Sequence, residues 1–184
     1  TRIEPIEGIS DAVPIIENQA LLSSAGRASG VMVRGISWHD FYNRPLLRQS
    51  IIAGTLDDFK DDGVAMGNVL ARKLGLGIGD QFTLTSPQVK ATPFGSMPRQ
   101  ARYTVAQIFD VGMHEYNSNF IFMPLPTAQT FFGMKDNVSA IEIFLSQPER
   151  LDEVKNAVSL MVEGQAGVYD WRDLNASFFN ALQV

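Results

Sequence analysis

The sequence predicts an α+β fold in which helices cover mixed β-sheets. With 184 residues, of which 45% are hydrophobic and 19% charged, the chain can bury a sizeable core and is not of a disordered type. Runs rich in β-branched and aromatic residues alternate with helix-like segments through most of the chain. No apolar run reaches the roughly 18 to 20 residues that a membrane-spanning helix needs. We therefore expect one domain or two small subdomains.

The first third of the chain is predicted to form a β-hairpin followed by short helices. Residues 9–24 indicate a strand, and residues 31–36 a second, β-branched strand after a turn around Gly26. Residues 37–52 carry aromatic and leucine side chains at spacings typical of helical turns, which Pro45 splits. We expect these aromatic side chains to pack in the core.

The clearest local unit is a strand, a helix and a second strand. Residues 64–66 indicate a short strand, Asn68 can cap the following helix, and Gly75 can end it in the left-handed conformation. The next strand then places Phe82 and Leu84 on one face. Because the glycines follow the helix, no helix N-terminus faces a phosphate, and we reject a nucleotide site.

The second half of the chain alternates strands and helices. Residues 102–112 are predicted to be a strand with Tyr103, Val105 and Phe109 on one face, and residues 114–119 a polar connection. The later elements are a strand ending at Pro124, a helix with Pro126 in its first turn, a strand at 138–145, a helix starting at Pro148, a short strand at 167–171 and a terminal helix starting at Asp173 or Asn175.

The composition argues against several classes of function. A net charge of -5 argues against a nucleic-acid surface, and the absence of cysteine removes thiolate chemistry and Cys-based zinc sites. The two histidines, His39 and His114, have no ligand spacing, and the acidic residues 56–62 are better explained as a solvated turn than as a cation site. We predict no catalytic residue, metal or cofactor. An unrecognised hydrolase site at residues 110–117 is the enzymatic alternative.

Residues 87–102, PQVKATPFGSMPRQAR, interrupt two well-formed strands. Three prolines remove backbone donors, so we expect a stiff, extended loop that projects from the sheet and cannot join a central ladder. The loop also combines Phe94 and Met97 with Arg99 and Arg102. That combination indicates a docking surface; the alternative is a loop folded back so that its apolar side chains cap the core.

Four segments, 63–87, 92–132, 138–154 and 169–182, together resemble a known family. It is the MacB-like periplasmic core domain of lipoprotein-releasing ABC transporter permeases of the LolC, LolE and LolF type, which is related to the MacB and FtsX permeases. The pattern TP-x-G-x-x-P, followed by an aromatic strand and VGMxEY, resembles the LolC and LolF branch. The resemblance implies that residues 87–102 form a protruding, hook-like β-hairpin.

In that branch the hook captures the periplasmic lipoprotein chaperone LolA. Carried over by position, two prolines and a glycine frame the hook, Phe94 is its apolar tip, and Gln100 lies at its base. The family's Gln-Arg pair is Gln100-Ala101 here, so either flanking arginine can serve, and Thr83 stands where some relatives have a basic group. The partner-binding residues that the resemblance implies are Pro93, Phe94, Gly95, Met97, Pro98, Arg99, Gln100 and Arg102.

The resemblance also implies a cellular setting. Residues 1–184 would be a periplasmic domain lying between two transmembrane helices of an inner-membrane permease. Its partners would be LolA, the cytoplasmic ATPase subunit LolD through the full-length permease, a second permease subunit, and lipoprotein substrates. The domain itself would not be an enzyme. The alternative is a MacB-like or FtsX-like domain that acts in efflux, toxin export or activation of a cell-wall hydrolase.

Overall fold

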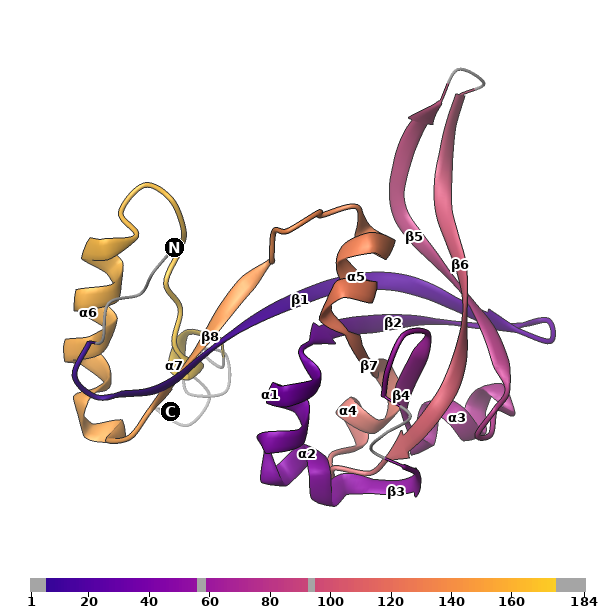
Figure 1. Cartoon of the computed structure of the whole chain (residues 1–184), viewed down its shortest axis with the longest axis horizontal. Coiled ribbons are helices and arrows are strands. Elements are labelled where there is room, and N and C mark those ends of the chain that lie inside the picture. Colours follow the sequence, from indigo (N-terminus) through magenta and orange to yellow (C-terminus); the bar gives the residue numbers. More distant parts are fainter. Residues whose placement is uncertain (1–5, 56–58, 93–94, 175–184) are drawn as a thin grey trace, which may run out of the picture. The chain divides into compact units, whose positions relative to one another are not determined.

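The computed structural model describes residues 6–55, 59–92 and 95–174. The chain divides into two compact units, unit 1 (Thr1–Ala12 and Ile143–Val184) and unit 2 (Val13–Glu142). The strands, labelled in Figure 1, are β1 (Ile9–Ser24), β2 (Arg27–Ile36), β3 (Ile51–Gly54), β4 (Gly63–Gly67), β5 (Gln81–Thr92), β6 (Gly95–Phe109), β7 (Phe120–Pro124) and β8 (Ala140–Leu145). The helices are α1 (Trp38–Asn43), α2 (Pro45–Ser50), α3 (Asn68–Leu74), α4 (His114–Asn119), α5 (Leu125–Phe132), η2 (Pro148–Arg150), α6 (Leu151–Met161) and α7 (Trp171–Leu174).

The strands form one mixed sheet, which confirms the predicted fold class. Their order is β2-β7-β4-β6-β5-β1-β8, and a further pairing of β1 with β2 closes a ring of six strands. β2 pairs with β7, and β4 with β6, in parallel, whereas β1 with β2, β1 with β5 and β5 with β6 are antiparallel. β3 pairs with β6 outside this ring.

One face of the sheet, here called the core face, carries the larger apolar cluster. Even-numbered residues of β1 and odd-numbered residues of β2 point to it, because side chains alternate along a strand. Helices α3 and α5 supply further side chains to the same cluster. Its members include Ile16, Leu22, Val33, Leu70, Leu74, Leu84, Tyr103, Val105, Phe131 and Phe132. Gly35 lacks a side chain where β2 meets Ala128 of α5, and a Cβ there would collide with it.

The opposite face, here called the outer face, is covered over only part of its area. Val13 and Ile15 of β1 and Phe122 of β7 pack there against Phe41 of α1 in a second apolar cluster. The Phe122 ring meets the Phe41 ring edge-on, with centroids 5.6 Å apart. Farther along β1, Leu21 points to the same face and is 48% exposed.

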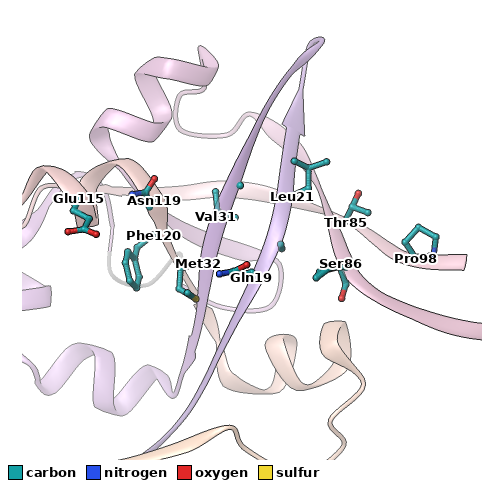
Figure 2. A pocket seen from close by; sticks show the side chains of 13 residues that line it. Gln19, Leu21, Val31, Met32, Thr85, Ser86, Pro98, Glu115, Asn119 and Phe120 are labelled. Atoms are coloured by element: carbon teal, nitrogen blue, oxygen red, sulfur yellow. The ribbon is translucent and has the colours of Figure 1, made fainter. Parts of the chain in front are cut away.

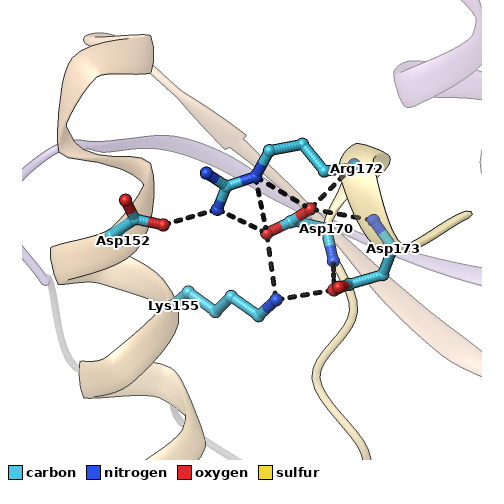
Figure 3. Close-up of polar contacts among 5 residues, drawn as sticks. All are labelled: Asp152, Lys155, Asp170, Arg172 and Asp173. Carbon is cyan, nitrogen blue, oxygen red and sulfur yellow. Dashed lines mark hydrogen bonds and ion pairs between the residues drawn. The ribbon is translucent and has the colours of Figure 1, made fainter. Parts of the chain in front are cut away.

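Unit 1 has a smaller apolar core. Of its described residues, Val154 and Val158 of α6 are the buried apolar ones, as their spacing on the amphipathic helix predicted, whereas Met161 is 39% exposed. Ion pairs join α6 to the segment that begins α7 (Figure 3): Lys155 Nζ lies 2.9 Å from Asp170 Oδ2 and 2.6 Å from Asp173 Oδ2. Asp170 Oδ1 also accepts the backbone N–H of Arg172 at 2.7 Å, which caps α7.

Several sequence predictions about local structure are confirmed. Strand 9–24, helix 68–74 and the helix that ends at Phe132 occur as expected. Within the predicted helical segment 37–52, residues 38–43 and 45–50 form helices that separate at Pro45, whereas Ile51 and Ile52 begin strand β3. Gly75 has φ 69° and ends α3 in the left-handed conformation. The terminal helix was predicted to continue beyond Leu174, in a part of the chain outside the described residues.

Other predictions about local structure are wrong. Residues 114–119 form helix α4, and residues 167–171 are not a strand. Asn68 does not cap α3; the N-cap is Gly67, and the Asn68 side chain donates to Asp110 instead. Phe109 lies in the outer-face cluster, because the register of β6 against β4 shifts after Val105 and reverses the alternation.

Residues 87–102 were predicted to form a stiff, extended loop that projects from the sheet and joins no central ladder; the described residues do project, but as paired strands. β5 and β6 continue to pair up to Thr92 opposite Gly95, with Val89 opposite Pro98. Pro87 and Pro98 are compatible with this ladder. Pro87 falls in the register shift between Thr85 and Val89, and Pro98 lies where β6 has an edge that pairs with no other described strand. The segment is thus a strand hairpin, as the family resemblance implied.

Candidate partner-binding site

The distal part of the β5–β6 hairpin stands clear of the sheet. β1 pairs with β5 only over Thr83–Thr85, and β4 pairs with β6 from Thr104 onward. Among the described residues, 89–92 and 95–98 therefore pair only with each other. Figure 1 shows these parts of the two strands extending away from the other strands of unit 2.

Strand alternation gives the hairpin two different faces. Met97 and Arg99 of β6 point to the side on which α5 packs, since Ala101 and Tyr103 continue that row into the core face. Pro98 and Gln100 point to the outer face. Met97 is 60% exposed and Gln100 is exposed, so both are available to a partner.

Arg99 is held within the unit. Its Nη1 donates to the carbonyl oxygen of Thr130 at 3.0 Å, near the end of α5, where a cation also interacts favourably with the helix dipole. Gly133, which ends α5 with φ 68°, leaves room for the guanidinium, and a Cβ there would collide with it. Arg99 therefore anchors the base of the hairpin to α5.

Arg102 lies on the outer face instead. It pairs across the ladder with Thr83, and Gln100 pairs with Thr85. A depression of about 270 Å³ runs along this row between Ser23, Thr83 and Arg102. The two arginines that the sequence left as alternatives thus have different surroundings, and Arg102 is the more accessible one.

A larger groove of about 770 Å³ lies beside the hairpin on the uncovered part of the outer face. Figure 2 shows Glu115, Asn119 and Phe120 at one side, strands β1 and β2 across the middle, and the hairpin base at the other side. Gln19, Leu21 and Met32 form the floor, and Thr85, Pro87 and Pro98 form the hairpin side. The groove is open to solvent and is not an enclosed cavity.

Helix α4, which bounds the groove, is fixed by a polar network. Asp110 accepts hydrogen bonds from the side-chain amides of Asn117 at 2.6 Å and Asn68 at 2.7 Å, and from the backbone N–H of Gly112 at 2.9 Å. Asn117 Oδ1 in turn accepts the N–H of Val111 at 3.1 Å. The N–H of Gly112, followed by the Asn117 amide, holds the pKa of Asp110 below its usual range.

That network explains why the prediction of a polar connection at 114–119 is wrong. It also argues against the alternative of a hydrolase site at residues 110–117. The hydrogen bonds of Asn117 are tertiary, so local propensity could not reveal that they support a helix. Because Asp110 already accepts structural donors on both oxygens, it is poorly suited to act as a general base. No group of three or more potential metal ligands occurs in the described part of the chain.

Three of the residues carried over from the resemblance have no described side chain. Pro93 and Phe94 lie outside the described residues, and Gly95 is placed only as the partner of Thr92. The structure brings Met97, Pro98, Gln100 and Arg102 together on one exposed hairpin. The groove beside it has no signal in the sequence: residues 20–22 are all apolar, and only the structure shows that Leu21 is exposed between buried Ala20 and Leu22.

The fold and the site define a mixed-sheet domain that presents a projecting hairpin beside an uncovered sheet face. The family model described as MacB-like periplasmic core domain matches residues 2–160. The chain belongs to this family. None of its described helices is long and apolar enough to cross a bilayer.

The curated relatives are named lipoprotein-releasing system transmembrane protein LolC. The protein from Xylella fastidiosa is 29% identical over 178 residues, and the one from Neisseria meningitidis is 27% identical over 183 residues. These matches cover 96% and 97% of this chain but only 43% and 44% of the relatives. The chain thus spans less than half the length of these relatives.

Two solved structures share the fold. The extracellular domain of the ABC-type transporter YknZ from Gram-positive bacteria has a TM-score of 0.59 at 12% identity, covering 89% of this chain and 80% of that one. The periplasmic region of MacB from Actinobacillus actinomycetemcomitans has a TM-score of 0.58 at 11% identity, covering 95% and 78%. At these identities the likeness concerns the fold alone.

Proposed function

We propose that the chain is the periplasmic domain of an inner-membrane ABC transporter permease that releases lipoproteins and passes them to the chaperone LolA. ATP hydrolysis would take place in a separate cytoplasmic subunit, LolD, and the full-length permease would act with a second permease subunit. The names of the curated relatives support the transport class. The observation that carries the chaperone role is the hairpin, whose distal residues pair only with each other among the described residues.

The hairpin is suited to insertion into a partner. Its two strands are already ordered by their mutual ladder, so little conformational entropy is lost when a partner binds them. Met97 presents an exposed apolar side chain, and the resemblance adds Phe94 as the tip. Because Arg99 is engaged with α5, Arg102 and Gln100 are the polar residues that would contact the chaperone.

The test is calorimetric titration of the purified chain with LolA from the same organism. Phe94→Glu and Met97→Glu should each weaken binding by at least about 30-fold, as expected of apolar interface anchors. Leu46→Glu is the matched control, because Leu46 of α2 is 63% exposed, close to the 60% of Met97, and lies outside the hairpin. Circular dichroism should show all three variants folded.

The outcomes separate the alternatives. Binding that both hairpin variants retain would contradict the assigned surface. A folded chain that does not bind LolA at all would contradict the lipoprotein role and favour efflux, toxin export or activation of a cell-wall hydrolase.

A further inference from the structure

The ladder of the β5–β6 hairpin is interrupted near its base. The register shifts between Thr85 and Val89, so residues 86–88 of β5 lie opposite a single residue of β6, Arg99. An irregularity of this kind disrupts the ladder locally and bends the strand that carries the extra residues. Ser86 is fully buried, whereas the residue after it is exposed. The boundary between the packed and the projecting parts of the hairpin therefore falls within residues 86–88, here called the bulge.

Arg99, opposite the bulge, is bonded to the end of a helix. Its Nη1 donates to the carbonyl oxygen of Thr130 at 3.0 Å, whereas the backbone N–H of Gly133 reaches the same oxygen at 3.3 Å. The last carbonyl groups of a helix have no intrahelical donor, so Arg99 supplies the shorter of these two hydrogen bonds. Its guanidinium occupies the space that a side chain at Gly133 would need. The bulge and the contact with α5 thus lie at the same level of the hairpin.

The row of β6 side chains that faces α5 changes character at Arg99. Toward the core, the Tyr103 ring meets the Phe131 ring of α5 edge-on, with centroids 5.9 Å apart. Beyond Arg99, the described side chains of β6 are exposed, with Met97 60% accessible to solvent. Counted outward from the core, Arg99 is therefore the last described side chain of β6 with a hydrogen bond to the rest of unit 2.

We propose that Arg99 is a positioning residue, which fixes the direction in which the distal hairpin (residues 89–92 and 95–98) projects. It does so by holding β6 against α5 opposite the bulge. When the bond to Thr130 is broken, the distal hairpin bends about the bulge. The consequence for chaperone binding rests on the proposed function, since a hairpin held in one direction loses less freedom when a partner binds. The positioning itself does not depend on what binds.

The first test measures the direction of the hairpin. The chain contains no cysteine, so Leu46→Cys on α2 and Ser96→Cys on the distal hairpin provide unique sites for two nitroxide labels. Double electron-electron resonance then gives the distribution of distances between the labels. Arg99→Ala should broaden this distribution at least about twofold. Arg99→Lys should restore part of the narrow distribution, because its ammonium group can donate to the same carbonyl oxygen. Circular dichroism should show that each variant is folded.

Gly133→Ala tests the same contact from the side of α5 and retains the arginine. Its Cβ would displace the guanidinium, so the distribution should broaden as in Arg99→Ala. The double variant should show no further broadening, because both changes break one contact. Gly26→Ala is the matched control. Gly26 has φ 78°, close to the 68° of Gly133, but a Cβ there meets no atom within 4 Å. It carries a similar backbone strain and should leave the distribution unchanged.

Titration with LolA separates positioning from direct contact. Arg99→Ala and Gly133→Ala should each weaken binding about tenfold, because the direction of the hairpin is no longer fixed. Weaker binding in Arg99→Ala with unchanged binding in Gly133→Ala would instead indicate direct contact and overturn the positioning role.

The distance measurement tests the proposal whatever the chain binds. A distribution that stays narrow in Arg99→Ala would overturn it. A chain that does not bind LolA, but whose distribution broadens in both variants, would support the positioning role of Arg99 and contradict the proposed function. The two failures are therefore distinguishable.

Discussion

The two units of the molecule are stabilised in different ways. Unit 2 has two apolar clusters, one on each face of its sheet, with aromatic rings in mutual contact. Unit 1 has two buried valines among its described residues and a group of ion pairs between α6 and residues 170–173. Burial of apolar area is the larger stabilising term, whereas exposed ion pairs contribute little. We therefore expect unit 2 to carry most of the stability, and unit 1 to be the more easily perturbed.

The largest expected effect is loss of an aromatic side chain from unit 2. Phe122 is 3% exposed and contacts the rings of Phe41 and Phe109. Phe122→Ala should lower the free energy of unfolding by about 3–5 kcal/mol, because it leaves a cavity that rigid neighbours cannot fill. Urea denaturation measures this change. A loss below about 1 kcal/mol would show that the outer-face cluster is not the stabilising centre that its burial indicates.

A smaller and more local effect is expected in unit 1. Asp170 caps α7, and its carboxylate is bonded to Arg172 and Lys155. Asp170→Ala should speed amide exchange in α7 roughly tenfold, as loss of an N-cap typically does, and leave exchange in the strands of unit 2 unchanged. Hydrogen exchange followed by mass spectrometry resolves the two units. Equally accelerated amide exchange in both units would contradict the expectation that loss of this cap affects unit 1 alone.

The smallest effects are expected from changes in pH. Unit 1 should lose stability at acid pH, and unit 2 at alkaline pH. The Arg172 guanidinium, together with Lys155 and backbone N–H groups, holds the pKa of Asp170 well below its usual range. A lowered pKa in the folded state contributes stability that is complete above about pH 4 and is lost as the pH falls through the lowered value. Below pH 4, protection in α7 should therefore fall before protection in unit 2.

The expected loss of stability at alkaline pH concerns Tyr103 of unit 2. Burial, together with the nearby Asp62, raises the pKa of this phenol from 10.0 to about 12. A raised pKa contributes stability that is complete below pH 10 and is lost as the pH rises through 12. Absorbance of the phenolate should show one tyrosine with a midpoint near 12, which disappears in Tyr103→Phe. A midpoint near 10 for every tyrosine would contradict the burial of this side chain.

The sequence by itself determined the elements that depend on neighbouring residues. The spacing of Val154 and Val158, the glycine at the end of α3 and the proline that separates α1 from α2 act over a few residues, so each element could be predicted locally. The family pattern likewise indicated a hairpin at 87–102.

Only the tertiary structure decided which residues meet across the sheet. Arg99 donates a hydrogen bond to Thr130 of α5, whereas Arg102 is exposed. This difference depends on strand alternation and on the placement of a helix that is distant in sequence. Helix α4 depends on bonds from Asn117 to Asp110, and the groove depends on which part of the outer face the helices leave uncovered. These features arise from packing between segments far apart in the chain, which local propensity does not encode.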